Sequence, residues 1–294
     1  MIEFFSRGDL YFTADAHLSF VCGAADPKGG EPPKFRRQFL DWADKNQRNL
    51  VCVRAENAAT DLLREVAERH ATPNLAKFED AIAHIVDSLL IFPESPGSFA
   101  ELGFFSANDE MCKKILVAVL AEHQGNSFIM LGPIRNIGTK SSFAPIPMVL
   151  SEPYDSAFQQ IADRLLGEGK ATRNYRTRFS LKPWKDYGDR EKLEILDCIF
   201  DILGICTEAD VFDFIHKRFG NFDASGVRLL IAMLAALGRI VRNDDADIIR
   251  LASAFPPNFI EGADDELTEL RAKWNDGYRT HLPEAIKEFA EKNP

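Results

Sequence analysis

Residues 86–103 encode a strand, a tight turn and the start of a helix, and this stretch constrains the fold most. The run Val86–Phe92 is short and aliphatic and ends at a proline, which indicates a buried strand. Residues 93–97 include two prolines and a glycine, so the chain turns there. Ser98 is the expected N-cap of a helix at 99–108. In open α/β sheets, ligands bind at such a place, outside the carboxyl end of a strand.

Glu101 lies in the first turn of this expected helix, and its spacing leaves two interpretations open. In the first, Ser98 and Glu101 form a capping box, because Ser-x-x-Glu is common at helix starts. In the second, the Glu101 carboxylate is a nucleophile or charge stabiliser for a sugar that loses its base. Spacing by itself favours the capping box.

The stretch from Asp87 to Gly103 reads DSLLIFPESPGSFAELG and resembles the nucleoside 2-deoxyribosyltransferase-like superfamily. It looks most similar to the deoxyribosyltransferase-like effectors of bacterial retron anti-phage systems, in which an almost identical FPESPGSFxELG stretch occurs. In that superfamily the Glu of the E-(L/I)-G helix start is the nucleophile, and the resemblance assigns this role to Glu101. It also implies that Glu79, eight residues before Asp87, contacts the substrate and assists proton transfer at the base.

The turn departs from the superfamily at one position. Bacterial deoxyribosyltransferases usually carry Asp six residues before the nucleophile, where this chain has Ser95, with Glu94 beside it. Either Glu94 substitutes for that Asp, or the two prolines simply shape the turn. The departure leaves the proton chemistry of a true base-exchange enzyme open.

The remaining candidate substrate contacts follow an earlier strand. The run 18–22 is typical of a buried strand, and it ends at a glycine-rich loop, 23–30, that lacks the GxGxxG pattern. Such a loop either lies free at the surface or lets the backbone approach ribose and phosphate closely. In the resembling families this loop helps to line the nucleotide pocket. The candidate substrate-binding residues are Cys22, Gly23, Ala24, Glu94, Ser95, Gly97 and Ser98.

Strands alternate with amphipathic helices over residues 18–150, which predicts a doubly wound, mostly parallel α/β sheet. Helices are expected at 34–46, 58–70, 74–86 and 156–166, and further strands at 49–54 and 113–119. We therefore expect a deoxyribosyltransferase-like N-glycosidase domain at 1–154, a basic linker at 155–188 and a second domain at 189–294.

The second domain has the pattern of a winged helix with a charged helical tail. Three amphipathic helices at 191–203, 208–219 and 224–237 precede two short strands within 239–251, and Thr207 is an expected cap. The recognition-helix candidate at 224–237 carries Arg228 as its one cation, whereas major-groove readers need Arg, Asn or Gln. Use of this domain for assembly is therefore favoured over sequence-specific duplex binding.

Cations and aromatic residues gather at 170–185, within a chain whose formal net charge is -10. This combination suits a phosphate backbone or exposed bases. The alternative is a linker whose cations balance the acidic surface nearby. The candidate partner contacts are Arg173, Arg176, Arg178, Lys182 and Lys185, among the aromatic residues Tyr175, Phe179 and Trp184.

The five cysteines are scattered, without a CxxC pair and without histidine at zinc spacing, so neither a metal site nor a disulfide framework is expected. No stretch approaches the length of a membrane span, and the N-terminus lacks the pattern of a signal peptide. We expect a soluble, cytoplasmic protein without membrane association.

The resemblance implies an effector toxin that hydrolyses NAD to nicotinamide and ADP-ribose, with NAD as substrate and no cofactor. It also implies that the retron reverse transcriptase and its multicopy RNA–DNA hybrid hold the toxin inactive. Two alternatives stay open: a nucleoside or nucleotide N-glycosidase or deoxyribosyltransferase, and a non-catalytic adaptor that senses a nucleotide and binds through its winged helix. The oligomeric state is open too, with a homo-oligomer or a filament among the options.

Overall fold

The chain folds into two compact units, each described here by itself. The computed structural model describes residues 3–13, 16–27, 29, 31–54, 75–120, 125, 127–167, 177–243, 248–251, 260–262 and 264–281. The unit called the sheet unit contains the described residues between 16 and 54 and between 75 and 167. The unit called the C-terminal unit contains residues 3–13 and the described residues from 177 onwards. The helix expected at 58–70 lies outside the described residues.

The sheet unit is built on five parallel strands in the order β3-β2-β4-β5-β6. Their bounds are His17–Cys22 (β2), Leu50–Val53 (β3), Ser88–Ile91 (β4), Ile115–Leu120 (β5) and Met148–Leu150 (β6). The predicted parallel sheet is confirmed. The chain first steps from β2 to β3 and then returns past β2 to β4, so the strand order reverses between β2 and β4. In doubly wound sheets this reversal opens a crevice at the carboxyl ends of the strands.

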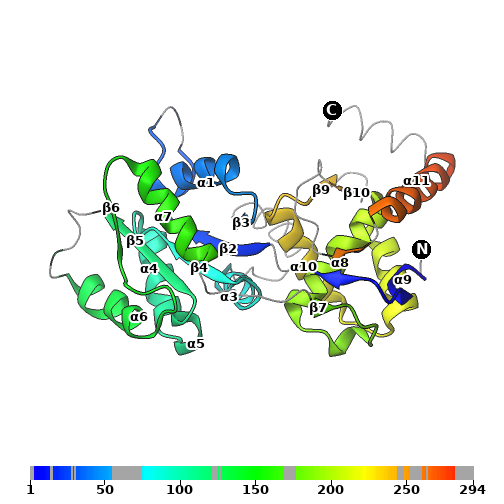
Figure 1. Cartoon of the computed structure of the whole chain (residues 1–294), viewed down its shortest axis with the longest axis horizontal. Coiled ribbons are helices and arrows are strands. Elements are labelled where there is room, and N and C mark those ends of the chain that lie inside the picture. Colours follow the sequence, from blue (N-terminus) through cyan, green and yellow to red (C-terminus); the bar gives the residue numbers. More distant parts are fainter. Residues whose placement is uncertain are drawn as a thin grey trace. The chain divides into compact units, whose positions relative to one another are not determined.

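Helices cover both faces of this sheet, as Figure 1 shows. On one face, Val21, Leu90 and Leu116 share a core with α1 and α7. On the other face, Phe20 of β2 contacts Phe105 of α4, with ring centroids 6.2 Å apart. The helices of the unit are α1 (Phe35–Asn46), α3 (Leu75–Ile85), α4 (Pro96–Ser106), α5 (Asp109–Cys112), the π-helical turn η3 (Met130–Ile134), α6 (Arg135–Lys140) and α7 (Tyr154–Leu166).

The C-terminal unit combines helices with a three-stranded antiparallel sheet in the order β8-β10-β9. The three helices predicted at 191–203, 208–219 and 224–237 are confirmed to within two residues, and Thr207 caps the second. The elements are η4 (Trp184–Asp186), α8 (Asp189–Leu203), β8 (Ile205–Thr207), α9 (Glu208–Phe219), α10 (Ala224–Ala236), β9 (Ile240–Asn243), β10 (Ile248–Leu251) and α11 (Asp264–His281). Among the described helices, none could cross a membrane alone by length and hydropathy, and α9 with α10 pass only as a pair bent by 119°.

The aromatic N-terminal segment belongs to the C-terminal unit, although we predicted it as part of the first domain. It forms a short 3-10 helix, η1 (Phe4–Ser6), and the strand β1 (Tyr11–Phe12), which pairs with β7 (Thr177–Arg178) and β11 (Ile260–Glu261). Its Phe5 is 1% exposed and contacts three aromatic rings from beyond this segment, those of Phe179, Phe214 and Phe219. The aromatic rings of the N-terminal segment thus complete a core whose other residues lie far along the chain. The predicted linker at 155–188 is likewise divided, because α7 lies in the core of the sheet unit.

A buried ion pair joins α8 to the residue before β9. Arg239 donates to Asp197 from Nε at 2.7 Å and from Nη2 at 2.5 Å, and the two side chains are 7% and 3% exposed. Burial raises the pKa of Asp197, and the attraction of Arg239 opposes that shift. Neither charge can be removed by itself without leaving the other buried and uncompensated.

We expect Asp197→Asn to lower the free energy of unfolding by about 3 kcal/mol, because the buried guanidinium loses its counter-charge. Replacing both partners, with Asp197→Leu and Arg239→Met, should recover most of that loss, since an apolar pair fills the space without charge. Urea unfolding measures both values. The control is Asp189→Asn, which removes an ion pair with Lys192. The Asp189 carboxylate is 66% exposed. If Asp197→Asn costs no more than this control, the assigned role of the pair is wrong.

Candidate active site

Helix α4 begins three residues earlier than predicted, and this changes the roles of Ser98 and Glu101. The N-cap is Ser95, whose hydroxyl accepts from the Ser98 amide at 3.2 Å, while the Ser98 hydroxyl accepts from the Ser95 amide at 2.9 Å. The capping box is therefore formed by two serines. Pro96 fits the first helical position, where a missing amide costs nothing. The interpretation in which Ser98 and Glu101 form the capping box, which spacing by itself favoured, is therefore wrong.

Glu101 instead meets the end of β2. Its carboxylate lies near enough to the Cys22 thiol to raise the pKa of that thiol, and its Oε2 is shielded from solvent. The packing of Phe20 on Phe105 explains this proximity. Cys22 follows Phe20 by two residues along the strand, and Glu101 precedes Phe105 by four residues along the helix, so both pairs lie on the same packed faces. Glu101 is thus directed towards the place where the strand order reverses.

Glu79, the second predicted carboxylate, comes to the same place from α3. Burial raises the pKa of the Cys22 thiol well above its ordinary value, and the negative charges of Glu101 and Glu79 raise it further. The positive charge of Arg36 acts in the opposite direction. Two carboxylates and one guanidinium therefore act electrostatically on a single thiol at the end of β2. Carboxylates beside a binding crevice are the groups that glycoside chemistry uses.

Arg36 was not among the site residues that we predicted from the sequence. It lies in the first turn of α1, and its charge acts on the same thiol. It is 4% exposed, and its Nη2 lies 3.6 Å from Oδ1 of Asp26. Gly23 makes room for it, because a Cβ at position 23 would lie 2.5 Å from the Cβ of Arg36. An arginine in the first turn of a helix opposes the helix dipole. This unfavourable placement of a cation was the one signal in the sequence that Arg36 could belong to the site.

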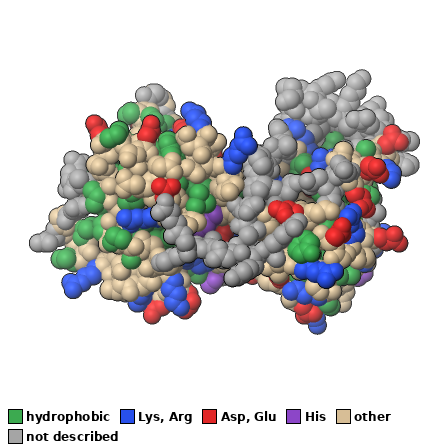
Figure 2. Space-filling model, viewed as in Figure 1, with side chains coloured by type: hydrophobic (Ala, Val, Ile, Leu, Met, Phe, Trp, Pro, Cys, Tyr) green, Lys and Arg blue, Asp and Glu red, His purple; other side chains and the backbone are tan. Residues whose placement is uncertain are grey.

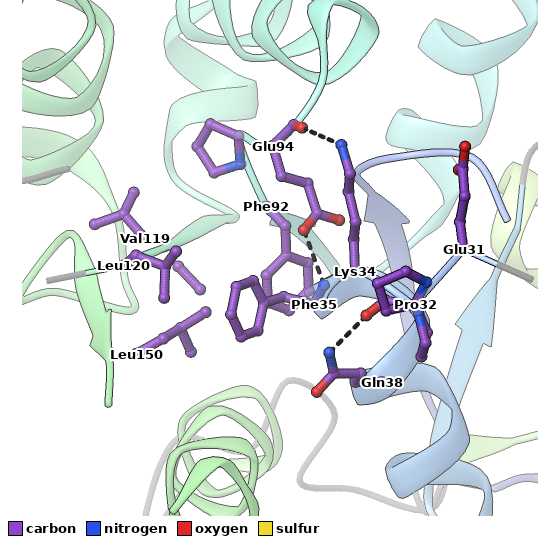
Figure 3. A pocket seen from close by; sticks show the side chains of 13 residues that line it. Glu31, Pro32, Lys34, Phe35, Gln38, Phe92, Glu94, Val119, Leu120 and Leu150 are labelled. Atoms are coloured by element: carbon purple, nitrogen blue, oxygen red, sulfur yellow. Dashed lines mark hydrogen bonds between the residues drawn. The ribbon is translucent and has the colours of Figure 1, made fainter. Parts of the chain in front are cut away.

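The Glu94 carboxylate is bonded to three backbone amides, and Figure 3 draws the bond from Phe35. Oε1 accepts from Ala24 and Arg36, both at 3.1 Å, and Oε2 accepts from Phe35 at 2.9 Å. A carboxylate is suited to the N-terminus of α1, where unpaired amides and the helix dipole favour negative charge. The N-cap residue, Lys34, does not cap the helix with its side chain, which instead donates to the Glu94 carbonyl at 3.2 Å. Glu94 therefore fastens α1 to the loop after β2, and a substrate contact by Glu94 stays a prediction.

All of the predicted substrate contacts lie at the carboxyl ends of β2 and β4, and two side-chain hydrogen bonds join these ends in addition to the backbone bond from Phe92 to Cys22. Ser95 donates to the carbonyl of Gly23 at 3.4 Å, and Glu94 accepts from the amide of Ala24. Ser98 is fully buried, and its hydroxyl is used within the capping box. Gly97 is exposed at the start of α4. Direct binding of substrate by any of these residues stays a prediction.

Two apolar cavities border the turn between β4 and α4. The larger, of about 560 Å³, lies against the start of α1 and is lined by apolar residues that include Phe35, Phe92 and Leu120 (Figure 3). The smaller, of about 360 Å³, is lined by residues that include Phe99 and Met130. Neither lining contains Glu101 or Glu79. Within the described chain, no three His, Cys, Asp or Glu side chains converge to hold a metal ion.

The basic segment is only partly available for binding. Arg173 and Arg176 lie outside the described residues. Arg178 is exposed and donates to the carbonyl of Gly8 at 2.8 Å. Lys182 pairs with Glu191 at 3.1 Å and lies 4.5 Å from the centroid of the Tyr187 ring, whereas Lys185 is exposed.

Tyr175 lies outside the described residues. Phe179 and Trp184 are not free to stack on bases, which corrects the expectation for these two residues. They are 3% and 4% exposed, because they complete the aromatic core around Phe5 and Phe219. Figure 2 shows basic and acidic side chains mixed over the face drawn there. Binding of a nucleic acid on that face would therefore depend on individual cations, not on a broad basic surface.

We expect Glu94→Ala to lower the free energy of unfolding by about 2 kcal/mol, because three backbone amides lose their acceptor. Glu94→Gln should lose about half as much, since it keeps one acceptor oxygen. Urea unfolding gives both values. Glu110→Ala is the control, because that side chain is 72% exposed and pairs only at the surface with Lys113. Equal losses in Glu94→Ala and Glu110→Ala would contradict the assigned role.

Comparison with known proteins places the chain among retron proteins. The model of the family described as STM3845 retron effector protein matches residues 32–242, which include parts of both units. The Escherichia coli protein named "Retron Ec86 putative ribosyltransferase/DNA-binding protein" is 31% identical over 146 residues, which are 48% of this chain and 48% of that protein.

A second Escherichia coli protein, "Retron Ec73 putative ribosyltransferase/DNA-binding protein", is 25% identical over 214 residues. The aligned part is 69% of this chain and 66% of that protein. The chain thus spans about half the length of the first relative and just under two thirds of the second.

Proposed function

The chain belongs to the STM3845 retron effector protein family, and on that premise we propose that its sheet unit cleaves an N-glycosidic bond at a ribosyl carbon. One observation carries the proposal. The charges of Glu101 and Glu79 both act on Cys22 at the carboxyl end of β2, beside the reversal of strand order, and Glu101 is not used as a helix cap. The word ribosyltransferase in the names of both relatives supports the same chemistry.

The reaction follows from the charges at this place. As the base departs, the ribosyl C1′ gains oxocarbenium character, and the Glu101 carboxylate stabilises or captures it. Glu79 orients the substrate and assists proton transfer at the base. Water then attacks C1′, so that the free base and a ribosyl product leave the site. With NAD as the proposed substrate, these products are nicotinamide and ADP-ribose.

We expect Glu101→Gln to lower NAD turnover about a thousandfold or more, because an amide neither captures nor stabilises a developing cation as a carboxylate does. Chromatography of NAD incubated with the purified chain measures the products, with a panel of nucleosides and nucleotides as competing substrates. Glu110→Gln is the matched control and should keep full turnover, because its side chain is 72% exposed at the surface. Thermal unfolding checks that both variants fold.

The outcomes separate the chemistry from the substrate. If a nucleoside or nucleotide were cleaved and NAD were not, the assignment of Glu101 as nucleophile would stand and the assignment of NAD as substrate would be wrong. Full turnover by Glu101→Gln would show that Glu101 is not the nucleophile and would contradict the proposed active site. Absence of any turnover, both alone and with the reverse transcriptase and its RNA–DNA hybrid, would favour a nucleotide-sensing adaptor.

We propose further that the C-terminal unit is a winged-helix-like module through which the reverse transcriptase and the hybrid restrain the toxic activity. The element order α8-β8-α9-α10-β9-β10, with a sheet of β8, β10 and β9, is typical of winged helices and supports this. Arg228, the one Lys or Arg of α10, pairs with Glu208 at 2.7 Å and covers the Phe212 ring. This pairing argues against base reading by α10. The exposed Arg178 and Lys185 are the proposed contacts.

We expect Lys185→Ser to weaken binding of the RNA–DNA hybrid several-fold and to lower the slope of log affinity against log salt by about one, since one phosphate contact is lost. Fluorescence titration at several salt concentrations measures both. Lys217→Ser is the control, because Lys217 is 55% exposed in the same unit and pairs with Asp213. Equal salt slopes for Lys185→Ser and the unmutated chain would remove this residue from the interface.

A further inference from the structure

Helix α4 has an outer face that is as apolar as its inner face. Leu102 and Phe105 are buried on the inner side. Every exposed residue of α4 is apolar or glycine, and Phe99 and Phe104 are 42% and 48% exposed. A surface helix normally turns polar and charged residues to the solvent, whereas a helix that is apolar all round is normally covered all round. The outer face of α4 therefore has the composition of a covered surface.

The segment around η3 has the most exposed large apolar side chain of the described residues. Phe128 immediately precedes η3 and is 83% exposed, and Leu131 within η3 is 55% exposed. Six large apolar side chains are exposed in the part of the chain that the structure describes, and four of them belong to α4 or to this segment. Exposed apolar side chains that gather in this way mark an interaction surface, whereas single ones do not.

Helix α4 and the segment around η3 form one continuous surface. They meet at the cavity of about 360 Å³, whose lining includes Phe99 of α4 and Met130 of η3. Asn136 in the following helix, α6, donates to the carbonyl of Ser106 at 2.8 Å and so joins the end of α4 to the same segment. The exposed surface is named the α4 patch, and its residues are Phe99, Ala100, Gly103, Phe104, Phe128 and Leu131.

We propose that the α4 patch is the interface between two copies of this chain, related by a two-fold axis. The patch contains both halves of a reciprocal contact. Phe128 is exposed on it, and the apolar cavity beside Phe99 and Met130 does not include Phe128 in its lining. In a two-fold interface the same surface meets itself, so each Phe128 enters the cavity of the other copy. A phenylalanine side chain fits within a cavity of about 360 Å³.

The lack of charge on the patch favours a second copy over a charged partner. The formal net charge of the chain is -10, so two copies repel each other wherever acidic surfaces meet. None of the six patch residues is charged, and two copies can therefore meet here without burying an unpaired ion. A basic partner would instead be attracted to acidic residues, which the patch lacks.

Gly103 indicates that the two copies approach closely. A Cβ at position 103 would meet no atom within 4 Å, and the residue lies inside α4, so neither packing nor backbone conformation within the chain requires glycine there. Glycine in a helix lowers its stability relative to alanine. On the helix surface, Gly103 and Ala100 lie between Phe99 and Phe104. They leave a shallow strip in which a helix of the other copy can lie.

The area of the patch is sufficient for a specific dimer of modest affinity. An aromatic side chain has roughly 200 Å² of surface, so the exposed fractions of Phe99, Phe104 and Phe128 leave about 350 Å² uncovered. With Leu131 and the small residues of α4, two copies would bury about 1,200 Å² in total, which is the lower end of the range for specific interfaces. We therefore expect a dimer that dissociates on dilution.

Sedimentation velocity of the purified full-length chain at several concentrations tests the proposal. We expect a monomer–dimer equilibrium for the unmutated chain, and a dissociation constant about tenfold higher or more for Phe128→Ser, because the buried aromatic ring is lost. Leu181→Ser is the matched control and should leave the constant unchanged, since Leu181 is 43% exposed and lies outside the patch. Thermal unfolding checks that each variant folds.

Two further variants test the geometry of the contact. Met130→Trp fills the cavity from its own copy and should weaken the dimer as Phe128→Ser does. An equal mixture of these two variants should associate more strongly than either alone, because one Phe128 then still meets one open cavity. Gly103→Leu should weaken the dimer by keeping the helices apart, although it adds apolar surface.

Four results would overturn the proposal. The first is an unmutated chain that stays monomeric at every concentration, and the second is equal dissociation constants for Phe128→Ser and Leu181→Ser. The third is a mixture no stronger than its components, or stronger association of Gly103→Leu, which would indicate unspecific adhesion. The fourth is a monomer that binds the reverse transcriptase only with Phe128 intact, which would assign the patch to that partner.

Discussion

Two neighbouring residues, Glu94 and Ser95, cap two different helices, and the geometry of the site depends on this. Glu94 accepts three amide hydrogens from α1 and from the loop after β2, whereas Ser95 caps α4. Both residues follow β4, so this single turn links the ends of β2 and β4, where the strand order reverses. Ends of parallel strands would otherwise carry loops whose positions are set only by distant packing. Here the position is set by charge-assisted hydrogen bonds.

This arrangement explains how two carboxylates can share one place. Because the serines cap α4 by themselves, Glu101 is available to face β2. Like charges repel at short range, and the cost falls when a cation stands beside them. Arg36 provides that cation within reach of the same thiol, and Gly23 leaves room for it. The guanidinium of Arg36 therefore offsets one of the two negative charges near the thiol.

The sequence predicted the strands well and the helix start poorly, and the reason is physical. Buried parallel strands are continuous apolar runs, which local composition reveals. The turn contains two overlapping caps, Ser95 with Ser98 and Ser98 with Glu101, and spacing does not separate them. Pro96 does, because proline belongs at the first position of a helix. The burial of Phe179 could not be predicted locally, since its partners lie in the distant segment that contains Phe5.

The capping role of Glu94 also bears on the choice of substrate. A purine or pyrimidine leaves more readily when an acid protonates it, and bacterial deoxyribosyltransferases usually have an Asp at the position of Ser95. Glu94 could have substituted for it, but its oxygens are bonded to three backbone amides, and Ser95 cannot act as an acid. The turn therefore offers no acid to the departing base. A pyridinium base such as nicotinamide departs as a neutral molecule without being protonated, whereas a purine or pyrimidine would depend on Glu79 alone for its proton. This difference is the chemical ground on which NAD is preferred over nucleosides as the proposed substrate.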